Sequence, residues 1–144
     1  MQERFRTFTV YVAKISRNIR RLKAEKMKSF NLKTPHVSCL YYLYREGELT
    51  AKQLCDICEE DKSGVSRSIE YLENEGYIEC DEKVKKRYKS PLKLTTKGLE
   101  VGKSIVDAID EVLLESSKGI SDEDLSTMYK SLDIICSNLE KTKI

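Results

Sequence analysis

The stretch 50–77 constrains the fold of this chain more than any other, because it predicts two short helices joined by a tight turn. Thr50 and Gln53 have the spacing of a capping box, in which each side chain satisfies a free backbone donor at the start of a helix. Asp61 is a suitable N-cap for the second helix. Gly76 can adopt the left-handed conformation that often ends a helix. These boundaries place two helices in direct succession.

The expected second helix, at about 62–75, has two distinct faces. Val65, Ile69 and Leu72 form one apolar stripe at helical spacing, so this side should pack into a core. Its other side offers groups that can donate hydrogen bonds to base edges and phosphates. The pattern fits a helix-turn-helix that enters the major groove of DNA, and it also fits an ordinary helical hairpin with a solvated face. The candidate DNA contacts are Lys62, Ser63, Ser66 and Arg67.

The segments 77–80 and 92–94 have the composition of short strands and predict a hairpin. The stretch 83–89 between them carries five basic side chains and no acidic one, in a chain whose net charge is only +2. Such a tip can simply protect a strand edge. Directly after a helix-turn-helix, we predict that it contacts phosphates or the minor groove. The candidate DNA contacts among these five are Lys83, Lys85, Lys86 and Arg87.

Both ends of the chain predict helices that need a partner surface. Over 5–22 the apolar residues are spaced alternately three and four apart, which is the pattern of a helix that packs along another. The same steps recur over 125–139. Thr34 and Pro35 predict the start of a further helix, with threonine as its cap.

Composition excludes several classes of protein. A length of 144 residues suits one domain, and no apolar run approaches the roughly 18 residues that a membrane span requires, so we expect a soluble, cytoplasmic protein. Five scattered cysteines and a single histidine make neither a disulfide framework nor a metal site. We expect no cofactor. No glycine-rich phosphate loop or nucleophile-base motif is visible, so we do not expect an enzyme.

The order of these elements resembles the MarR (multiple antibiotic resistance regulator) family of winged helix-turn-helix transcription factors over nearly the whole chain. The likeness rests on Thr-Pro before the helix-turn-helix, on Leu54 with the following Asp-Lys-Ser-Gly-Val-Ser-Arg of 61–67, on 72–78 and on 94–98. Each motif alone is weak, and all of them in register across one domain are more specific.

The resemblance implies a mainly α-helical fold with a small β-hairpin wing. It implies a homodimer whose N- and C-terminal helices interlock, with two recognition helices in successive major grooves of a pseudo-palindromic operator in double-stranded DNA. The resemblance therefore implies a sequence-specific regulator, most often a repressor. The alternative is a winged-helix module that holds a protein partner without sequence-specific DNA binding. Over a single domain of 1–144, the implied parts are dimerisation helices at 1–30 and 98–144, a winged helix-turn-helix at 34–95, a recognition helix at about 62–75 and a wing at about 77–94.

Family members commonly lose DNA binding in response to small aromatic ligands, oxidants or metals. A ligand pocket between the dimer helices and the DNA-binding lobe is implied, and the same residues could equally fill the core. Its candidate lining residues are Tyr11, Ile15, His36, Cys39 and Tyr42.

The chain departs from the family at the wing and in the first helix. The usual Asp-x-Arg-Asp of the wing is replaced here by Asp-Glu-Lys-Val at 81–84, and Arg87 lies further along, which leaves open the residue that enters the minor groove. The first helix has Tyr11 without a nearby cysteine, which argues against the family's organic-peroxide mechanism.

Overall fold

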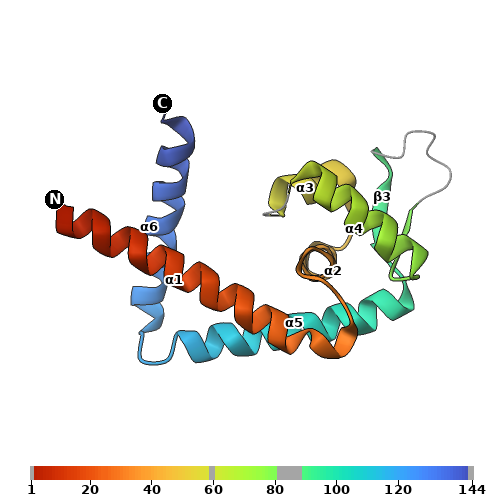
Figure 1. The fold of residues 1–144 in the computed structure, drawn as a ribbon, viewed down its shortest axis with the longest axis horizontal. Helices are drawn as coiled ribbons and strands as arrows, with labels where there is room; N and C mark the ends of the chain where they lie inside the picture. Colours follow the sequence, from red (N-terminus) through yellow and green to blue (C-terminus); the bar gives the residue numbers. More distant parts are fainter. Residues whose placement is uncertain (1, 59–60, 81–88, 143–144) are drawn as a thin grey trace. The chain divides into compact units, whose positions relative to one another are not determined.

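The computed structural model describes residues 2–58, 61–80 and 89–142, and it confirms the predicted mainly α-helical fold with a small sheet (Figure 1). The chain divides into two compact units, 1–110 and 111–144. In chain order the elements are α1 (Gln2–Lys26), the short 3-10 helix η1 (Lys28–Phe30), α2 (Thr34–Glu46), β1 (Leu49–Thr50), α3 (Ala51–Ile57), α4 (Lys62–Asn74), β2 (Ile78–Cys80), β3 (Pro91–Leu94), α5 (Thr96–Ser116) and α6 (Asp122–Lys141).

The predicted caps set the boundaries of α3 and α4. The Thr50 N–H donates to Gln53 Oε1 at 2.9 Å, and the Gln53 N–H donates to Thr50 Oγ1 at 3.2 Å, which completes the capping box. Asp61 caps α4 by accepting the Gly64 N–H at 2.8 Å. Both helices therefore begin where their first-turn donors find a side-chain acceptor.

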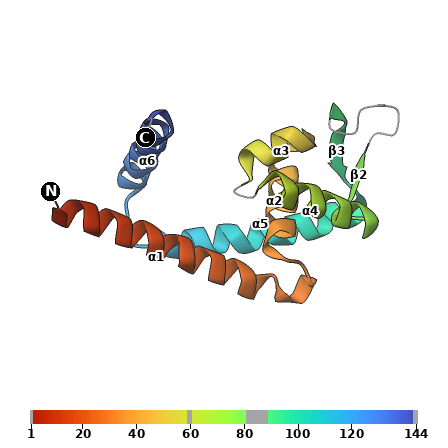
Figure 2. The same ribbon diagram turned by 45° about the horizontal axis from the view of Figure 1, so that its top comes forward.

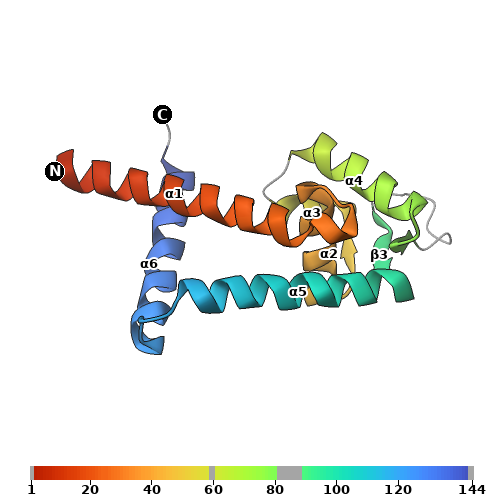
Figure 3. The same cartoon turned by 60° about the horizontal axis from the view of Figure 1, so that its bottom comes forward.

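The core of the first unit is built around α2, which lies between α4 and α5 (Figures 1 and 3). The apolar stripe predicted for α4 is buried, since Val65 and Leu72 are 0% exposed and Ile69 is 8% exposed. Two leucines of α2 and one of α3 are equally buried and pack into the same cluster. Burial of this kind contributes roughly 1.5–3 kcal/mol per large apolar side chain. The inward side of the helix-turn-helix thus packs into the core.

The sheet has three antiparallel strands in the order β1-β3-β2, as Figure 2 shows for β2 and β3 beside α4. Leu92 of β3 pairs with Leu49 on one side and with Cys80 on the other. The predicted hairpin strands are confirmed, and Pro91 stands first in β3, where a missing N–H is tolerated. No pattern in the sequence predicts β1, because a strand of two residues is too short to show alternation.

Helical spacing in the sequence predicts that Ile57, Leu99 and Leu113 face inward. In the structure they are exposed, Ile57 at 39%, Leu99 at 50% and Leu113 at 40%. Ile57 is the last residue of α3, and the extended backbone of the next residue turns that next side chain into the core instead. In α5 the buried face near the start is occupied by Gly98 and Gly102, which leaves Leu99 at its edge. The expected positions of these three side chains were wrong.

The start of α2 also differs from the prediction. Thr34 is already helical, and the cap position belongs to Lys33, whose backbone is extended at φ −81° and ψ 158°. The Lys33 N–H donates to His36 Nδ1 at 3.2 Å, so the histidine satisfies a free donor of the first turn. Pro35 remains in the first turn, where its missing N–H costs nothing.

The terminal helices keep much of their apolar surface exposed in the single chain. On α1, Phe8 is 40% and Ile15 is 58% exposed, and no described residue of α6 is buried. Ser121 and Asp124 have the spacing of an N-terminal cap, which predicts that a helix starts there. The structure confirms it, because Ser121 Oγ accepts the Asp124 N–H at 3.1 Å. Among the described helices, none combines the length and the apolar character needed to cross a membrane.

Candidate nucleic-acid interface

The first turns of α4 present the residues that the sequence singled out. Lys62, Ser63, Ser66 and Arg67 are all exposed, on the side of the helix away from the buried stripe. The Asp61 cap fixes where this surface begins, and the apolar contacts of Val65 fix which way it faces. Two cations and two hydroxyls within the first two helical turns match the groups that contact phosphates and base edges.

Ser63 differs from its neighbours, because its hydroxyl donates to Asp61 Oδ2 at 2.8 Å. This hydrogen bond, followed by the one from the Gly64 N–H, lowers the pKa of Asp61 below its usual value, so the cap stays ionised. A carboxylate therefore occupies the start of α4, where a phosphate could otherwise bind. The exposed positive charges near this end are those of Lys62 and Arg67.

A groove of about 800 Å³ lies beside α4 and is shared with α3 and the sheet. Lys62 and Ser66 line its α4 side, Cys55 its α3 side and Cys80 its strand side. Burial is the largest cause that raises the pKa of Cys55, which keeps the group a thiol. Cys58, one turn further along, is 7% exposed and packs in the core. In the described part of the chain, no three metal-binding side chains come together.

The basic tip predicted to contact DNA falls on Lys83, Lys85, Lys86 and Arg87, which lie outside the described residues. The strands on either side of this tip are described. β2 is the next element after α4 in the chain and begins four residues after it ends. Lys89, at the far end of the basic stretch, is exposed.

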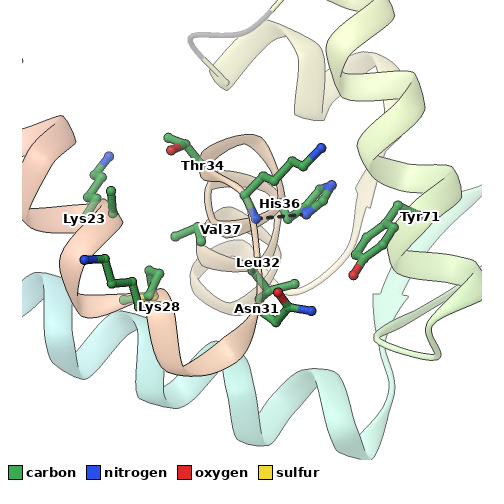
Figure 4. Close-up of a pocket in the computed structure, with 11 residues that line it drawn as sticks. Lys23, Lys28, Asn31, Leu32, Thr34, His36, Val37 and Tyr71 are labelled. Atoms are coloured by element: carbon green, nitrogen blue, oxygen red, sulfur yellow. Dashed lines mark hydrogen bonds between the residues drawn. The ribbon is translucent and has the colours of Figure 1, made fainter.

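A second cavity, of about 630 Å³, opens where the end of α1, the link to α2 and α4 meet (Figure 4). His36 and Tyr71 form one wall, with their rings stacked at 4.2 Å between centroids and 6° between planes. Lys23, Lys28 and Lys33 also line it. The cavity therefore combines a flat aromatic wall with cationic groups.

His36 is held as a neutral ring in this wall. Burial first, and the charge of Lys33 second, lower the pKa of His36 from its usual 6.5. Its Nδ1 accepts the Lys33 backbone N–H, so the proton of the neutral ring sits on Nε2. A neutral ring stacks on Tyr71 without bringing a further charge among the lysines.

The other residues predicted to line a ligand pocket lie elsewhere. Cys39 is buried in the core at 1% exposure, and Tyr42 packs against that core. Tyr11 and Ile15 of α1 are 60% and 58% exposed. Sequence reasoning missed Tyr71, because its partner His36 is 35 positions away and no local pattern links a histidine of one helix to a tyrosine of another.

Residues 30–87, which include α2, α3, α4 and β2, match the sequence model of the MarR family. No curated protein sequence matches the chain.

Solved structures of MarR-family proteins share the fold. NMB1585, a MarR family regulator from Neisseria meningitidis, is 21% identical with a TM-score of 0.82, over 96% of this chain and 94% of its own. Staphylococcus aureus MepR in its DNA-binding conformation is 20% identical with a TM-score of 0.82, over 92% of this chain and 98% of its own. Staphylococcus aureus MarR in complex with salicylate and kanamycin is 17% identical with a TM-score of 0.78, over 99% of this chain and 93% of its own.

Proposed function

We propose that this chain, which belongs to the MarR family of winged helix-turn-helix regulators, binds a pseudo-palindromic DNA operator as a homodimer and represses transcription. The observation that carries the proposal is the first turns of α4, where Lys62, Ser66 and Arg67 are exposed while Val65 is fully buried. A helix fixed from one side, with donors on the other, suits insertion into a major groove.

The proposed contacts divide into two classes. Arg67 has the length and the planar guanidinium for a bidentate contact with a guanine edge, which would read sequence. Lys62, at the very start of α4, and the basic wing residues would contact phosphates, which position the protein on any sequence. Phosphate contacts release counterions, so their contribution falls as salt rises.

The proposed dimer would cover the apolar surface that the terminal helices leave exposed. Phe8, Val12 and Ile15 follow one another on α1 at steps of three and four, and each is at least 40% exposed. On α6, Met128 and Leu132 are 40% and 36% exposed. Stripes of this kind pack against a partner helix in stable proteins. A dimer would set two α4 helices roughly 34 Å apart, one turn of the duplex.

The cavity beside His36 is the proposed site for a ligand that relieves DNA binding. Its size suits a small organic molecule. The stacked His36 and Tyr71 rings offer a flat apolar wall, and three lysines offer a counter-charge, which fits a small aromatic carboxylate. A structural relative, Staphylococcus aureus MarR, is in complex with salicylate. Because Tyr71 belongs to α4, a ligand at this wall would touch the recognition helix itself.

The DNA-binding proposal is tested by gel shift with the DNA that flanks the gene for this chain, at about 50 and 200 mM salt. We expect a defined complex whose affinity falls steeply with salt. Absence of a complex, or an affinity that ignores salt, would contradict the proposal and favour a protein-binding module instead.

The ligand site is tested by thermal unfolding with salicylate. A ligand at 100 times its dissociation constant should stabilise the protein by roughly 2.7 kcal/mol. Lys33→Met removes one charge of the cavity and keeps the backbone N–H that His36 accepts, so it should weaken the effect. Lys14→Met, on the exposed surface of α1, is the matched control. An equal response from both variants would place the ligand elsewhere.

A further inference from the structure

The end of α4 is joined to the start of α5 by hydrogen bonds to three consecutive backbone carbonyls. The Lys97 ammonium donates to the Glu75 carbonyl oxygen at 2.8 Å. Thr95 Oγ1 donates to the Gly76 carbonyl oxygen at 2.6 Å, and the Thr95 N–H donates to the Tyr77 carbonyl oxygen at 3.1 Å. We call Thr95, Lys97 and residues 75–77 the clasp. Figure 2 shows the start of α5 reaching the end of α4 at this place.

The clasp takes over where the helix itself can no longer pair its carbonyls. Gly76 is left-handed at φ 77°, and its N–H donates to the Glu73 carbonyl at 3.1 Å. The Tyr77 N–H donates to the Leu72 carbonyl at 2.8 Å. These bonds satisfy the carbonyls of Leu72 and Glu73 in the last turn of α4. The carbonyls of 75–77 follow the helix end, and residues outside α4 pair them.

Lys97 makes two contacts at this end. Besides the bond to the Glu75 carbonyl, its ammonium lies 4.2 Å from the centroid of the Tyr77 ring. A cation near the carboxyl end of a helix is favoured by the partial negative charge there, and a cation over an aromatic ring adds a further attraction. A single side chain on α5 therefore holds both the carbonyl of Glu75, the residue that follows α4, and the ring of Tyr77.

Thr95 also serves both helices. While its hydroxyl hydrogen goes to the Gly76 carbonyl, its oxygen accepts the Gly98 N–H at 3.1 Å and so caps α5. Gly98 is buried, and it lies against the Tyr77 carbonyl too closely for any side chain. The end of α4 and the start of α5 consequently cannot move apart or rotate without breaking several bonds together.

The length of α4 makes the clasp relevant to DNA binding, because a small rotation at one end of the helix moves the other end by several ångströms. Thirteen residues in α4 correspond to a helix of roughly 18–20 Å. A rotation of roughly 10° about the clasped end would displace the first turn, with Lys62 and Arg67, by about 3 Å. A base contact does not survive a displacement of this size, because N–H···O hydrogen bonds have donor–acceptor distances of only about 2.7–3.2 Å.

We propose that Lys97 is a positioning residue for the recognition helix: with Thr95, it fixes the orientation in which α4 meets DNA to α5. The inference rests on the proposed function, because it assumes that α4 is the helix that enters the groove. It assigns to Lys97 a role at the end of α4 opposite to the DNA-contacting turn. A movement of α5 would thereby change the orientation in which α4 meets DNA.

The test compares Lys97→Met, Lys97→Arg and the control Lys103→Met by fluorescence anisotropy on an operator that the unmodified protein binds. Lys103 lies on the same helix, and its ammonium pairs with Asp107 at 2.6 Å. We expect Lys97→Met to bind about tenfold more weakly, because only about a tenth of the molecules would hold α4 correctly. Lys97→Arg should bind within about twofold of the unmodified protein, since arginine keeps the charge and the donors, and Lys103→Met should bind unchanged.

Two further readouts separate positioning from other roles. If Lys97 touched a phosphate directly, Lys97→Met would reduce the slope of log affinity against log salt by about 1, whereas positioning leaves that slope unchanged. If Lys97 only stabilised the fold, melting temperature would fall while affinity at low temperature stayed the same. An unchanged affinity, or a reduced slope, overturns the proposal.

Hydrogen exchange keeps this proposal separate from the DNA-binding proposal. In the protein without DNA, Lys97→Met should speed exchange at the amides of Gly76 and Tyr77, which the clasped turn protects, and Lys103→Met should not. Failure of the unmodified protein to bind any DNA would defeat the proposed function, while unchanged exchange in Lys97→Met would defeat the clasp.

Discussion

Replacing Gly98 by alanine should destabilise this protein, although helix propensity alone predicts the opposite. Gly98 is the third residue of α5, and alanine is favoured over glycine inside helices by about 1 kcal/mol. A methyl group at this position would overlap the Tyr77 carbonyl oxygen, and it would lie 3.0 Å from the Tyr77 carbonyl carbon and 3.2 Å from Leu94 Cδ2. The obstacle is backbone, which cannot rotate away as a side chain can.

The structure sets the size of the effect. Overpacking of this kind costs about 1–3 kcal/mol. Moving α5 away from Tyr77 also strains the 3.1 Å bond between the Thr95 N–H and the Tyr77 carbonyl, and losing one such bond costs about 0.5–1.5 kcal/mol. The penalties outweigh the gain in propensity by about 2 kcal/mol. For a protein of this size the melting temperature should fall by about 4–8 °C.

The assay is urea unfolding followed by circular dichroism, at one fixed protein concentration because association raises apparent stability. Gly102→Ala is the matched control, since its methyl group would meet the Tyr44 side chain at 3.1 Å, and a side chain can give by a few tenths of an ångström. Gly102→Ala should stay within about 1 kcal/mol of the unmodified protein. If Gly98→Ala proves as stable as the unmodified protein or more so, the close approach of α5 to Tyr77 is refuted.

Three further predictions concern DNA and pH. Arg67→Ala should cost about 1–3 kcal/mol of operator binding and relax base preference at one position per half-site, as measured by affinity for a set of single-base variants; an equal loss on every sequence would contradict a base contact. Lys86→Ala should weaken binding to all sequences alike and reduce the salt slope by about 1, so a selective loss would contradict a phosphate contact. The pKa of His36 is lowered in the folded protein, so as pH falls the histidine is protonated in the unfolded chain before it is protonated in the folded one. The contribution of His36 to the stability of the folded protein should therefore decline as pH falls below about 6.5. His36→Gln should remove that part of the pH dependence in urea unfolding between about pH 7 and 5.5, and an unchanged profile would contradict a neutral, buried His36.

Local signals in the sequence were sufficient for the starts of α3, α4 and α6 and for the buried side of α4. Thr50, Asp61 and Ser121 each cap a helix through bonds within three residues, which is the range over which a sequence pattern carries such information. The stripe of α4 follows from helical periodicity, which is also local. The exposed side of α4 is simply its complement.

Features that depend on distant partners could not be predicted. The bond from Lys97 to the Glu75 carbonyl spans 22 positions, and the stacking of His36 on Tyr71 spans 35. Only the folded arrangement of the helices decides such pairs. The prediction that Ile57 faces inward was wrong for a related reason. The orientation of its side chain depends on where α3 ends rather than on its place in the periodic pattern.

Selection of bound fragments from random DNA tests the central claim most directly, because it asks at once whether the chain reads sequence and whether it does so as a pair. We expect enrichment of an inverted repeat whose half-sites lie one duplex turn apart, about 10 base pairs from centre to centre. Loss of base preference at one position of each half-site in Arg67→Ala would assign the reading to α4. Enrichment of no sequence, or of a single half-site without its inverted copy, would contradict the account.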